Sequence, residues 1–196
     1  MPLHTISVDH ALAALPAFPT LRGRAVHLRP PRMDDADALF RLFSQPDVTR
    51  YWSRPPMQAR VEAEGLLAEM HEAFAARSML TWLIVPRGRD TAIGTCTLFH
   101  FEPRNRSAEL GYALLPECWG HGLAAEAAAL ALAWGFDRLG LQRIEACTDP
   151  RNGRSRRLLE RLGFRSEGLM RGRLALGDAM RETEVFALAA RPGDRS

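Results

Sequence analysis

The sequence has 196 residues, of which 46% are hydrophobic and 25% charged, which is typical of a single globular domain. The three cysteines, Cys96, Cys118 and Cys147, have no C-x-x-C spacing, so a disulfide framework or a zinc site is not expected. All 26 basic residues are Arg, against 23 acidic residues, and they form no basic block. The net charge of +3 therefore predicts no nucleic-acid partner.

The sequence suggests neither a signal peptide nor a membrane-spanning segment. The N-terminus lacks the basic start of a signal peptide, and the longest apolar run, Ala127–Phe136, is too short to span a bilayer. Together with the cysteine spacing, this leads us to expect a cytoplasmic protein with no metal site. Residues 1–20 have weak periodicity and are interpreted as an N-terminal extension, residues 21–191 as the domain, and residues 192–196 as a C-terminal tail.

The first predicted element is a short strand at Ala25–Arg29. Asp34 is predicted to cap a helix with a buried apolar face, since acidic residues follow in its first turn. A loop containing Tyr51 and Trp52 comes next, and then a helix over about Gln58–Ala76, where apolar residues recur at spacings of three and four.

The middle of the chain predicts an antiparallel meander, because three strand patterns are separated by short turn-like segments. A helix then runs from Leu123 to about Leu139, with Gly140 behind it. The strands on either side of this helix need a crossover connection, so the sheet should be mixed. The predicted strands are 81–85, 93–101, 107–115, 142–148, 164–170 and 184–190, with a further helix at 154–162.

Gly120 and Gly122 flank His121 immediately before the long helix. Glycines allow close approach of a ligand, and the unpaired amides of a helix N-terminus attract anions, so a diphosphate is the expected guest. A loop whose glycines merely form a turn is the alternative. The spacing also fits the dinucleotide fingerprint, with Glu145 as its acidic residue.

Three observations argue against NAD. Residues Pro116–Trp119 separate the preceding strand from the first glycine, Glu145 lies in the middle of a strand, and an antiparallel meander precedes the loop. No Gly-Lys-Ser/Thr sequence is present, which excludes a P-loop.

The segment Trp119-Gly120-His121-Gly122-Leu123-Ala124 resembles the acetyl-CoA pyrophosphate loop of the GNAT superfamily, although Glu117 stands where Gln or Arg is usual. The longer run 108–127 resembles the branch of ribosomal-protein N-terminal acetyltransferases of the RimJ/RimL type. The segments Asn152–Ser155 and Leu158–Phe164 resemble the later CoA motif of the family. The resemblance covers about residues 22–190.

The resemblance implies a single-domain α/β GNAT fold. Its mixed, mostly antiparallel sheet would have about six to seven strands flanked by about four helices. The sheet would be splayed between strands 107–115 and 142–148, where the pantetheine arm of acetyl-CoA would hydrogen-bond as a pseudo-strand. The implied cofactor-binding residues are Leu110, Gly111, Tyr112, Trp119, Gly120, His121, Gly122, Leu123, Ala124, Asn152, Ser155 and Arg157.

The candidate catalytic residues lie on either side of this splay. Gly111 suggests a bulge whose amide could stabilise an oxyanion. Glu109, beside it, is the candidate general base, with a solvent-facing strand residue as the alternative. Ser155 is the candidate acid, because Leu159 occupies the position where many relatives carry Tyr. Asn152 could instead be a helix cap, and the Arg cluster at residues 154–157 could meet the 3′-phosphate or face solvent.

These residues suggest acetyl transfer from acetyl-CoA to a primary amine. Branch resemblance favours a protein or peptide N-terminal α-amine as acceptor, with Tyr51 and Trp52 as candidate acceptor-binding residues. A small-molecule amine (amino acid, polyamine or aminoglycoside) and a non-catalytic acyl-CoA-binding module remain alternatives. The protein is expected to be a monomer or a homodimer.

Overall fold

The computed structural model describes residues 7–52, 54–176 and 179–190, without the side chains of residues 171–181. Residues 1–6 of the predicted extension and the predicted tail 192–196 lie outside this range. Within it, no helix is both long and apolar enough to cross a membrane.

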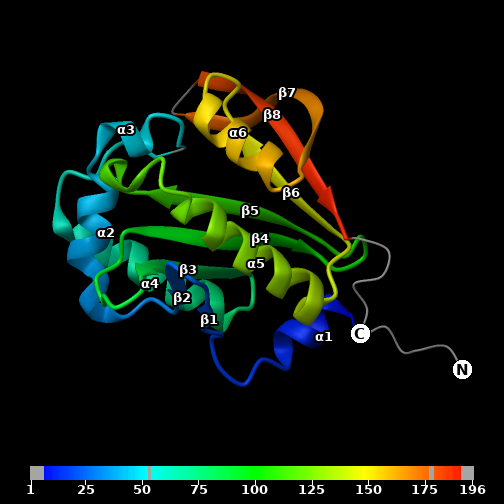
Figure 1. Cartoon of the computed structure of the whole chain (residues 1–196), viewed down its shortest axis with the longest axis horizontal. Helices are drawn as coiled ribbons and strands as arrows, with labels where there is room; N and C mark the ends of the chain where they lie inside the picture. The colour runs from blue at the N-terminus through cyan, green and yellow to red at the C-terminus, as the bar shows by residue number, and fades with distance from the viewer. Residues whose placement is uncertain (1–6, 53, 177–178, 191–196) are drawn as a thin grey trace, which may run out of the picture.

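One sheet forms the centre of the molecule (Figure 1). Its order is β1-β2-β3-β4-β5-β6-β8-β7, and every neighbouring pair is antiparallel except β5 and β6. The predicted mixed α/β fold is confirmed, with eight strands in place of six to seven. The additional strand is β1, whose two residues are too few to produce an alternating pattern. The strands are β1 Leu21–Arg22, β2 Val26–Arg29, β3 Met79–Pro86, β4 Gly94–Glu102, β5 Ser107–Leu114, β6 Arg143–Thr148, β7 Arg165–Leu176 and β8 Ala179–Ala189.

The described residues form six α-helices where about four were predicted. The two additional ones, α1 and α3, have six and four residues, and such short segments carry little periodicity. The helices are α1 Val8–Ala13, α2 Ala36–Phe43, α3 Pro46–Thr49, α4 Arg60–Ala75, α5 Leu123–Leu139 and α6 Gly153–Arg161; Met33–Asp35 and Pro116–Cys118 are short 3₁₀ turns.

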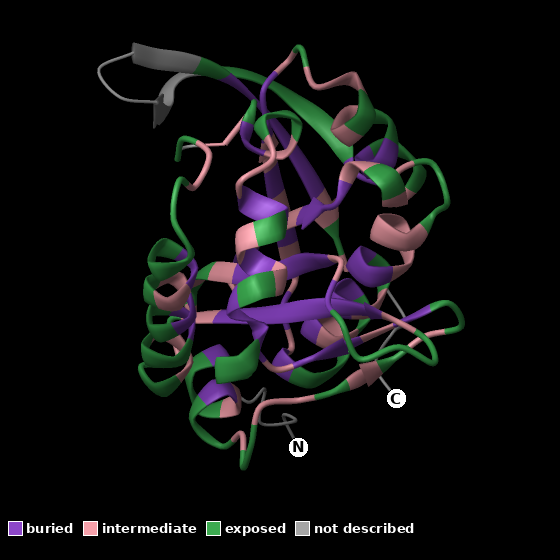
Figure 2. Ribbon diagram, turned by 90° about the vertical axis from the view of Figure 1, so that its left-hand side faces the viewer, coloured by how far each residue is buried: buried purple, intermediate pink, exposed green. Residues whose placement is uncertain are grey.

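The sheet separates two apolar clusters. One lies under α1 and α5 and contains Trp82, Leu98 and Phe186, and the other lies under α2 and α4 and contains Phe43 and Leu67. Figure 2 shows the same layering, with buried residues along the strands and exposed residues on the outer sides of the helices. Helices on both faces leave the strand ends as the places where a ligand can reach the sheet.

The segment before β1 packs against the domain. Val8 and Leu12 of α1 are buried in the cluster under α5. The ring of Phe18 contacts that of Phe74 in a tilted arrangement and meets Trp82 edge-on. The indole N–H of Trp82 donates a hydrogen bond to the carbonyl of Pro19 at 2.8 Å. Residues 8–19 therefore cover apolar surface that α5 and β3 would otherwise expose.

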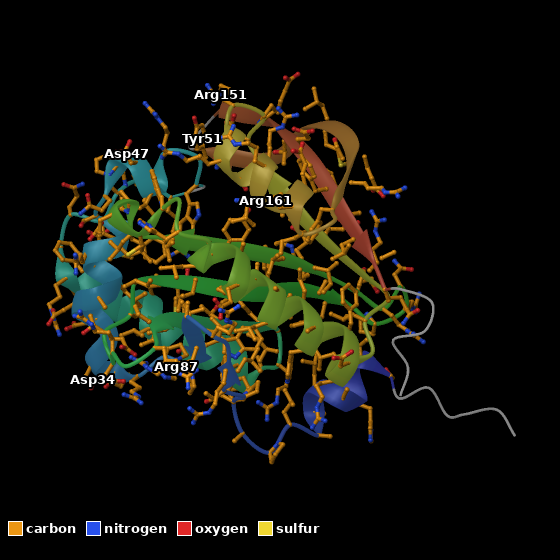
Figure 3. All side chains as sticks on the ribbon, viewed as in Figure 1. Asp34, Asp47, Tyr51, Arg87, Arg151 and Arg161 are labelled. Atoms are coloured by element: carbon orange, nitrogen blue, oxygen red, sulfur yellow. The ribbon has the colours of Figure 1, made fainter. Side chains whose placement is uncertain are left out.

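The start of α2 differs from the prediction. Asp35 is buried: its Oδ2 accepts a hydrogen bond from the amide of Arg32 at 2.7 Å, and its carboxylate receives both terminal guanidinium nitrogens of Arg29 at 2.6 and 2.7 Å. The predicted cap, Asp34, is exposed on the outside of the molecule (Figure 3). Two adjacent Asp residues give the same capping signal, and only Arg29 on β2 distinguishes them.

The sheet divides between β5 and β6, as predicted. These strands pair at three positions only, from Ser107 with Arg143 to Glu109 with Glu145. Beyond Glu109, β5 stays paired with β4 while β6 stays paired with β8, so the two strands diverge (Figure 1). The bulge predicted at Gly111 is wrong, because Gly111 pairs regularly with Thr97 and the irregularity lies between Phe99 and Glu102.

The last two strands are longer than predicted. The sequence predicts strands 164–170 and 184–190, whereas β7 and β8 form a hairpin that continues to residues 176 and 179. The extra residues include Gly172, Arg173 and Arg181, which are not typical of a strand. Arg181 pairs with Leu174, and Gly172 and Arg173 lie where the register between β7 and β8 shifts.

Candidate active site

A large cleft opens where β5 and β6 diverge. Its volume of about 1360 Å³ exceeds that of a pocket for a drug-sized molecule and suits an extended ligand. The second half of β5, the end of β6, the loop before α5 and the inner side of α6 form its walls, and α3 closes one end. Among the lining residues are Asp47, Arg50, Tyr51, Trp52, Tyr112, Cys118, Trp119, Gly120, Gly122, Cys147, Thr148, Arg151, Asn152, Arg154, Ser155, Arg157 and Arg161.

The loop before α5 provides an anion site in this cleft. Gly120 and Gly122 have φ angles of 82° and 77°, and a Cβ on either would meet no atom within 4 Å. The first hydrogen bond of α5 runs from the amide of Glu126 to the carbonyl of Gly122. The amides of Leu123, Ala124 and Ala125 therefore need partners outside the helix, and these three residues line the cleft.

Trp119 and Arg154 face each other across the cleft. The indole N–H of Trp119 donates to the carbonyl of Leu114 at 2.7 Å, which fixes the ring. The guanidinium carbon of Arg154 lies 4.5 Å from the centre of that ring. Arg157 and Arg161 also line the cleft, so α6 contributes three Arg residues to a wall suited to phosphates.

Glu117, the acidic residue in the loop, is directed away from the cleft. Its carboxylate binds the guanidinium of Arg41 on α2 at 2.5 Å, and it is not among the lining residues. Both side chains are more than half exposed, so the ion pair contributes little to stability. The guanidinium of Arg41 nevertheless offsets the negative charge of Glu117 near the site where a diphosphate would bind.

The first turn of α6 presents a fixed serine hydroxyl. Asn152 caps the helix, as the alternative interpretation held, because its Oδ1 accepts a hydrogen bond from the amide of Ser155 at 3.2 Å. The Oγ of Ser155 lies 2.7 Å from the phenol oxygen of Tyr112 on β5. Burial raises the pKa of Tyr112 to about 12. Leu159, one turn further along α6, is buried and purely apolar.

Most of the predicted site residues lie together around the cleft; the predicted cofactor-binding residue His121 and the candidate base Glu109 do not line it. His121 is exposed between the two loop glycines. Glu109 lies at the base of the divergence, where Nδ1–H of His100 donates to its carboxylate at 3.2 Å. The predicted site residues that do line the cleft are Leu110, Gly111, Tyr112, Trp119, Gly120, Gly122, Leu123, Ala124, Asn152, Ser155, Arg157, Tyr51 and Trp52.

The sequence interpretation did not single out several lining residues. Arg151 comes from the turn after β6, and the phenol of Tyr51 donates to its carbonyl at 3.4 Å, which joins the α3 end of the cleft to α6 (Figure 3). Arg161 follows Arg157 by four residues, so both lie on one helix face. That spacing is the only signal in the sequence that could have identified Arg161.

Comparison with known proteins identifies the family. The family model for the acetyltransferase (GNAT) domain matches residues 25–165, which include the cleft walls from α3 to α6. The chain belongs to the GNAT family. Several relatives are named N-acetyltransferases, and the protein is an acetyl-CoA-dependent N-acetyltransferase rather than a dinucleotide-dependent oxidoreductase.

This GNAT enzyme is similar to acetyltransferases whose names give different acceptors or none. It is 32% identical over 171 residues to an uncharacterized N-acetyltransferase, YoaA, of Bacillus subtilis, covering 87% of this chain and 97% of that one. It is 31% identical over 147 residues to the spermidine N(1)-acetyltransferase of Escherichia coli, covering 74% and 76%. The structure of Mycobacterium smegmatis RimJ in complex with CoA-disulfide is similar with a TM-score of 0.78, at 30% identity, covering 88% and 86%.

The cleft of this GNAT enzyme fits the cofactor of the family. Acetyl-CoA supplies the acetyl group as a thioester. The open glycine loop and the amides of α5 suit its diphosphate, and the guanidinium groups of Arg154 and Arg157 add positive charge there. Between the diverging strands, backbone groups of β5 beyond Glu109 are not paired with β6 and can bind an amide-containing arm.

Proposed function

We propose that this GNAT enzyme acetylates the α-amino group of a protein or peptide N-terminus and belongs to the RimJ/RimL branch. The observation that carries the proposal is its similarity to RimJ, with a TM-score of 0.78 at 30% identity over 88% of this chain. In this assignment the α3 end of the cleft, with Tyr51 and Trp52, receives the acceptor.

The charge at the α3 end supports an acceptor with a single amine. Arg50 and Asp47 line this end, and the guanidinium of Arg151 binds Asp149 at 2.6 Å. These four side chains carry two positive and two negative charges. A polyamine carries several positive charges and binds best where negative charge is in excess.

The lower pKa of an α-amino group also favours a peptide N-terminus as acceptor. An α-amino group has a pKa near 7.7–8.0, whereas an alkyl amine such as that of Lys has a pKa near 10.4. A larger fraction of an α-amine is therefore neutral and nucleophilic at neutral pH. Such an acceptor needs only modest help from a base.

Spermidine is the second candidate acceptor, because the spermidine N(1)-acetyltransferase of Escherichia coli is 31% identical over 74% of this chain. A panel of acceptors separates the two candidates. Thiol release from acetyl-CoA is measured with N-terminal peptides, with the same peptides blocked at the α-amine, and with spermidine. We expect kcat/KM to be highest for the free peptides. A higher value for spermidine than for every peptide contradicts the proposal.

Glu109 is our proposed general base. It lies on β5 at the last pair before the strands diverge, and only 13% of its side chain is exposed. His100, which contacts it, has a φ of 49°, a strained value for a residue other than Gly. The irregular pairing between Phe99 and Glu102 gives this imidazole its position beside the carboxylate. Because Glu109 does not line the cleft, the proton of the amine would reach it through water.

The variant Glu109→Gln should bind CoA as tightly as the wild-type protein and lose rate most at low pH. There the amine is mostly protonated and depends most on a base, so kcat/KM should fall roughly 10²-fold or more. The measurement is a pH profile of kcat/KM. Glu145→Gln is the matched control, because Glu145 lies opposite Glu109 on β6 but binds Arg143 at 3.0 Å. An unchanged profile for Glu109→Gln, or equal profiles for both variants, would rule out this role.

A further inference from the structure

Tyr112 and Ser155 connect two parts of the molecule that the sheet leaves apart. Tyr112 lies on β5, three residues beyond the last position paired with β6, and Ser155 lies in the first turn of α6. Their hydroxyl oxygens are 2.7 Å apart, a short hydrogen bond between two groups that both line the cleft. Both residues belong to the wall of the cleft, so the bond lies beside the space in which the cofactor arm would lie.

The chemistry of the two hydroxyls indicates which one donates. A phenol is a stronger acid than an aliphatic alcohol and hence the better donor. The other acceptor within reach of Tyr112, the carbonyl of Ser155, is 3.4 Å away, so the contact to Oγ is the shorter one. Burial raises the pKa of Tyr112 to about 12, and the phenol keeps its proton throughout the neutral range. With Tyr112 as donor, the proton of Ser155 is left for another acceptor.

The serine is also held from a second side. Its amide donates to Oδ1 of Asn152, the cap of α6, which fixes its backbone. With backbone and Oγ both fixed, the remaining freedom is the direction of the O–H bond. The cleft is the space into which that bond can point, since Ser155 is one of its lining residues.

We propose that Tyr112 is a positioning residue that holds Ser155 so that the serine O–H points at the sulfur atom of CoA and stabilises the thiolate. The proposal rests on acetyl transfer from acetyl-CoA, and it gives Ser155, the candidate acid of the sequence analysis, the role of a hydrogen-bond donor. In that reaction the amine nitrogen bonds to the acetyl carbon, and the carbon–sulfur bond breaks with its electron pair on sulfur. The amine proton goes to Glu109 or to water. Tyr112 and Ser155 only donate hydrogen bonds, so neither loses its proton.

The first test measures binding and needs no acceptor. CoA affinity is compared with that of desulfo-CoA, which lacks the sulfur, across the ordinary thiol pKa near 8.5. Wild-type protein should bind CoA more tightly than desulfo-CoA once the thiolate forms, by about tenfold. Tyr112→Phe and Ser155→Ala should each lose this advantage while binding desulfo-CoA unchanged. The double variant should lose no more than either single variant. Full retention of the advantage in Tyr112→Phe would overturn the proposal.

The second test measures turnover with any amine that the wild-type enzyme acetylates, so that a wrong acceptor assignment does not affect it. Tyr112→Phe should lower kcat about tenfold and leave KM for acetyl-CoA within about twofold. Ser155→Thr, which keeps the hydroxyl, should retain most of the rate. If the losses in Tyr112→Phe and Ser155→Ala multiply in the double variant, the two residues act independently and the proposal is wrong.

A ring-fluorinated tyrosine at position 112 covers the case in which Tyr112→Phe does not fold. This residue keeps the shape and the hydroxyl but has a more acidic phenol. Once ionised, it accepts from Ser155 and turns the serine proton away from sulfur. We expect kcat to decline at alkaline pH where that of the wild-type enzyme does not; an unchanged profile contradicts the proposal. Thr97→Val is the control, because its hydroxyl bonds Thr81 at 3.1 Å outside the cleft lining.

Discussion

Asp35→Ala is expected to lower the free energy of unfolding by about 3–5 kcal/mol, the usual cost of removing one partner of a buried ion pair. Arg29 and Asp35 are only 5% and 6% exposed at their side chains, and two hydrogen bonds join them. The hydrogen bond with Asp35 raises the pKa of Arg29. Without that bond the guanidinium still stays charged, because an unperturbed Arg is protonated throughout the accessible pH range. The variant therefore leaves the buried guanidinium with the exposed carboxylate of Asp90, 3.7 Å from its Nε, as its ionic partner, and also removes the acceptor for the amide of Arg32.

Asp90→Ala is the matched control for this prediction. Asp90 binds Arg32 at 3.0 Å and also lies 3.7 Å from Nε of Arg29, but its side chain is 76% exposed. Its removal should cost less than about 1 kcal/mol. Urea denaturation of the wild-type protein and the two variants measures the difference. Equal losses in the two variants would show that burial does not determine the strength of the Arg29–Asp35 pair.

Gly122→Ala is expected to weaken CoA binding by at least about tenfold. Gly122 has a φ of 77°, and a side chain there would change the backbone of the loop that should hold the diphosphate. An Ala in this conformation costs about 1–2 kcal/mol of stability. It also places a methyl group in open space inside the proposed anion site.

Gly88→Ala separates the two effects. Gly88 lies in the turn between β3 and β4 and has the same φ of 77°, and a Cβ added there would likewise meet no atom within 4 Å. The two variants should lose similar stability in thermal unfolding, and calorimetric titration should show weaker CoA binding for Gly122→Ala alone. Unchanged CoA affinity in Gly122→Ala would mean that the loop does not hold the diphosphate.

Much of the fold could be predicted from the sequence, because its main signals are local. The long helix after Gly122 follows from a run of good helix formers ending at Gly140, which has a φ of 67°. The divergence of β5 and β6 could be predicted only through resemblance to the family, since neither strand differs in pattern from a paired one. The choice between Asp34 and Asp35 depended on Arg29, which lies on another element.

The candidate site was predictable in part for the same reason. The glycine loop and the cap at Asn152 are short contiguous motifs, and both line the cleft. The bond between Tyr112 and Ser155, and the ring contact between Trp119 and Arg154, join residues more than 30 positions apart. Nothing in the local sequence indicates such pairs, because they exist only once β5, α5 and α6 enclose the cleft.

The short contact between β5 and β6 means that strands β1–β5 and β6–β8 form two half-sheets, joined at three paired positions and by the apolar cluster beneath α5. A cofactor arm that hydrogen-bonds to both diverging edges would complete the ladder between the half-sheets. The ligand would then belong to the secondary structure of the enzyme as well as to its reaction. Opening of the β6–β8 half as a separate cooperative unit would be suppressed whenever the cleft is filled.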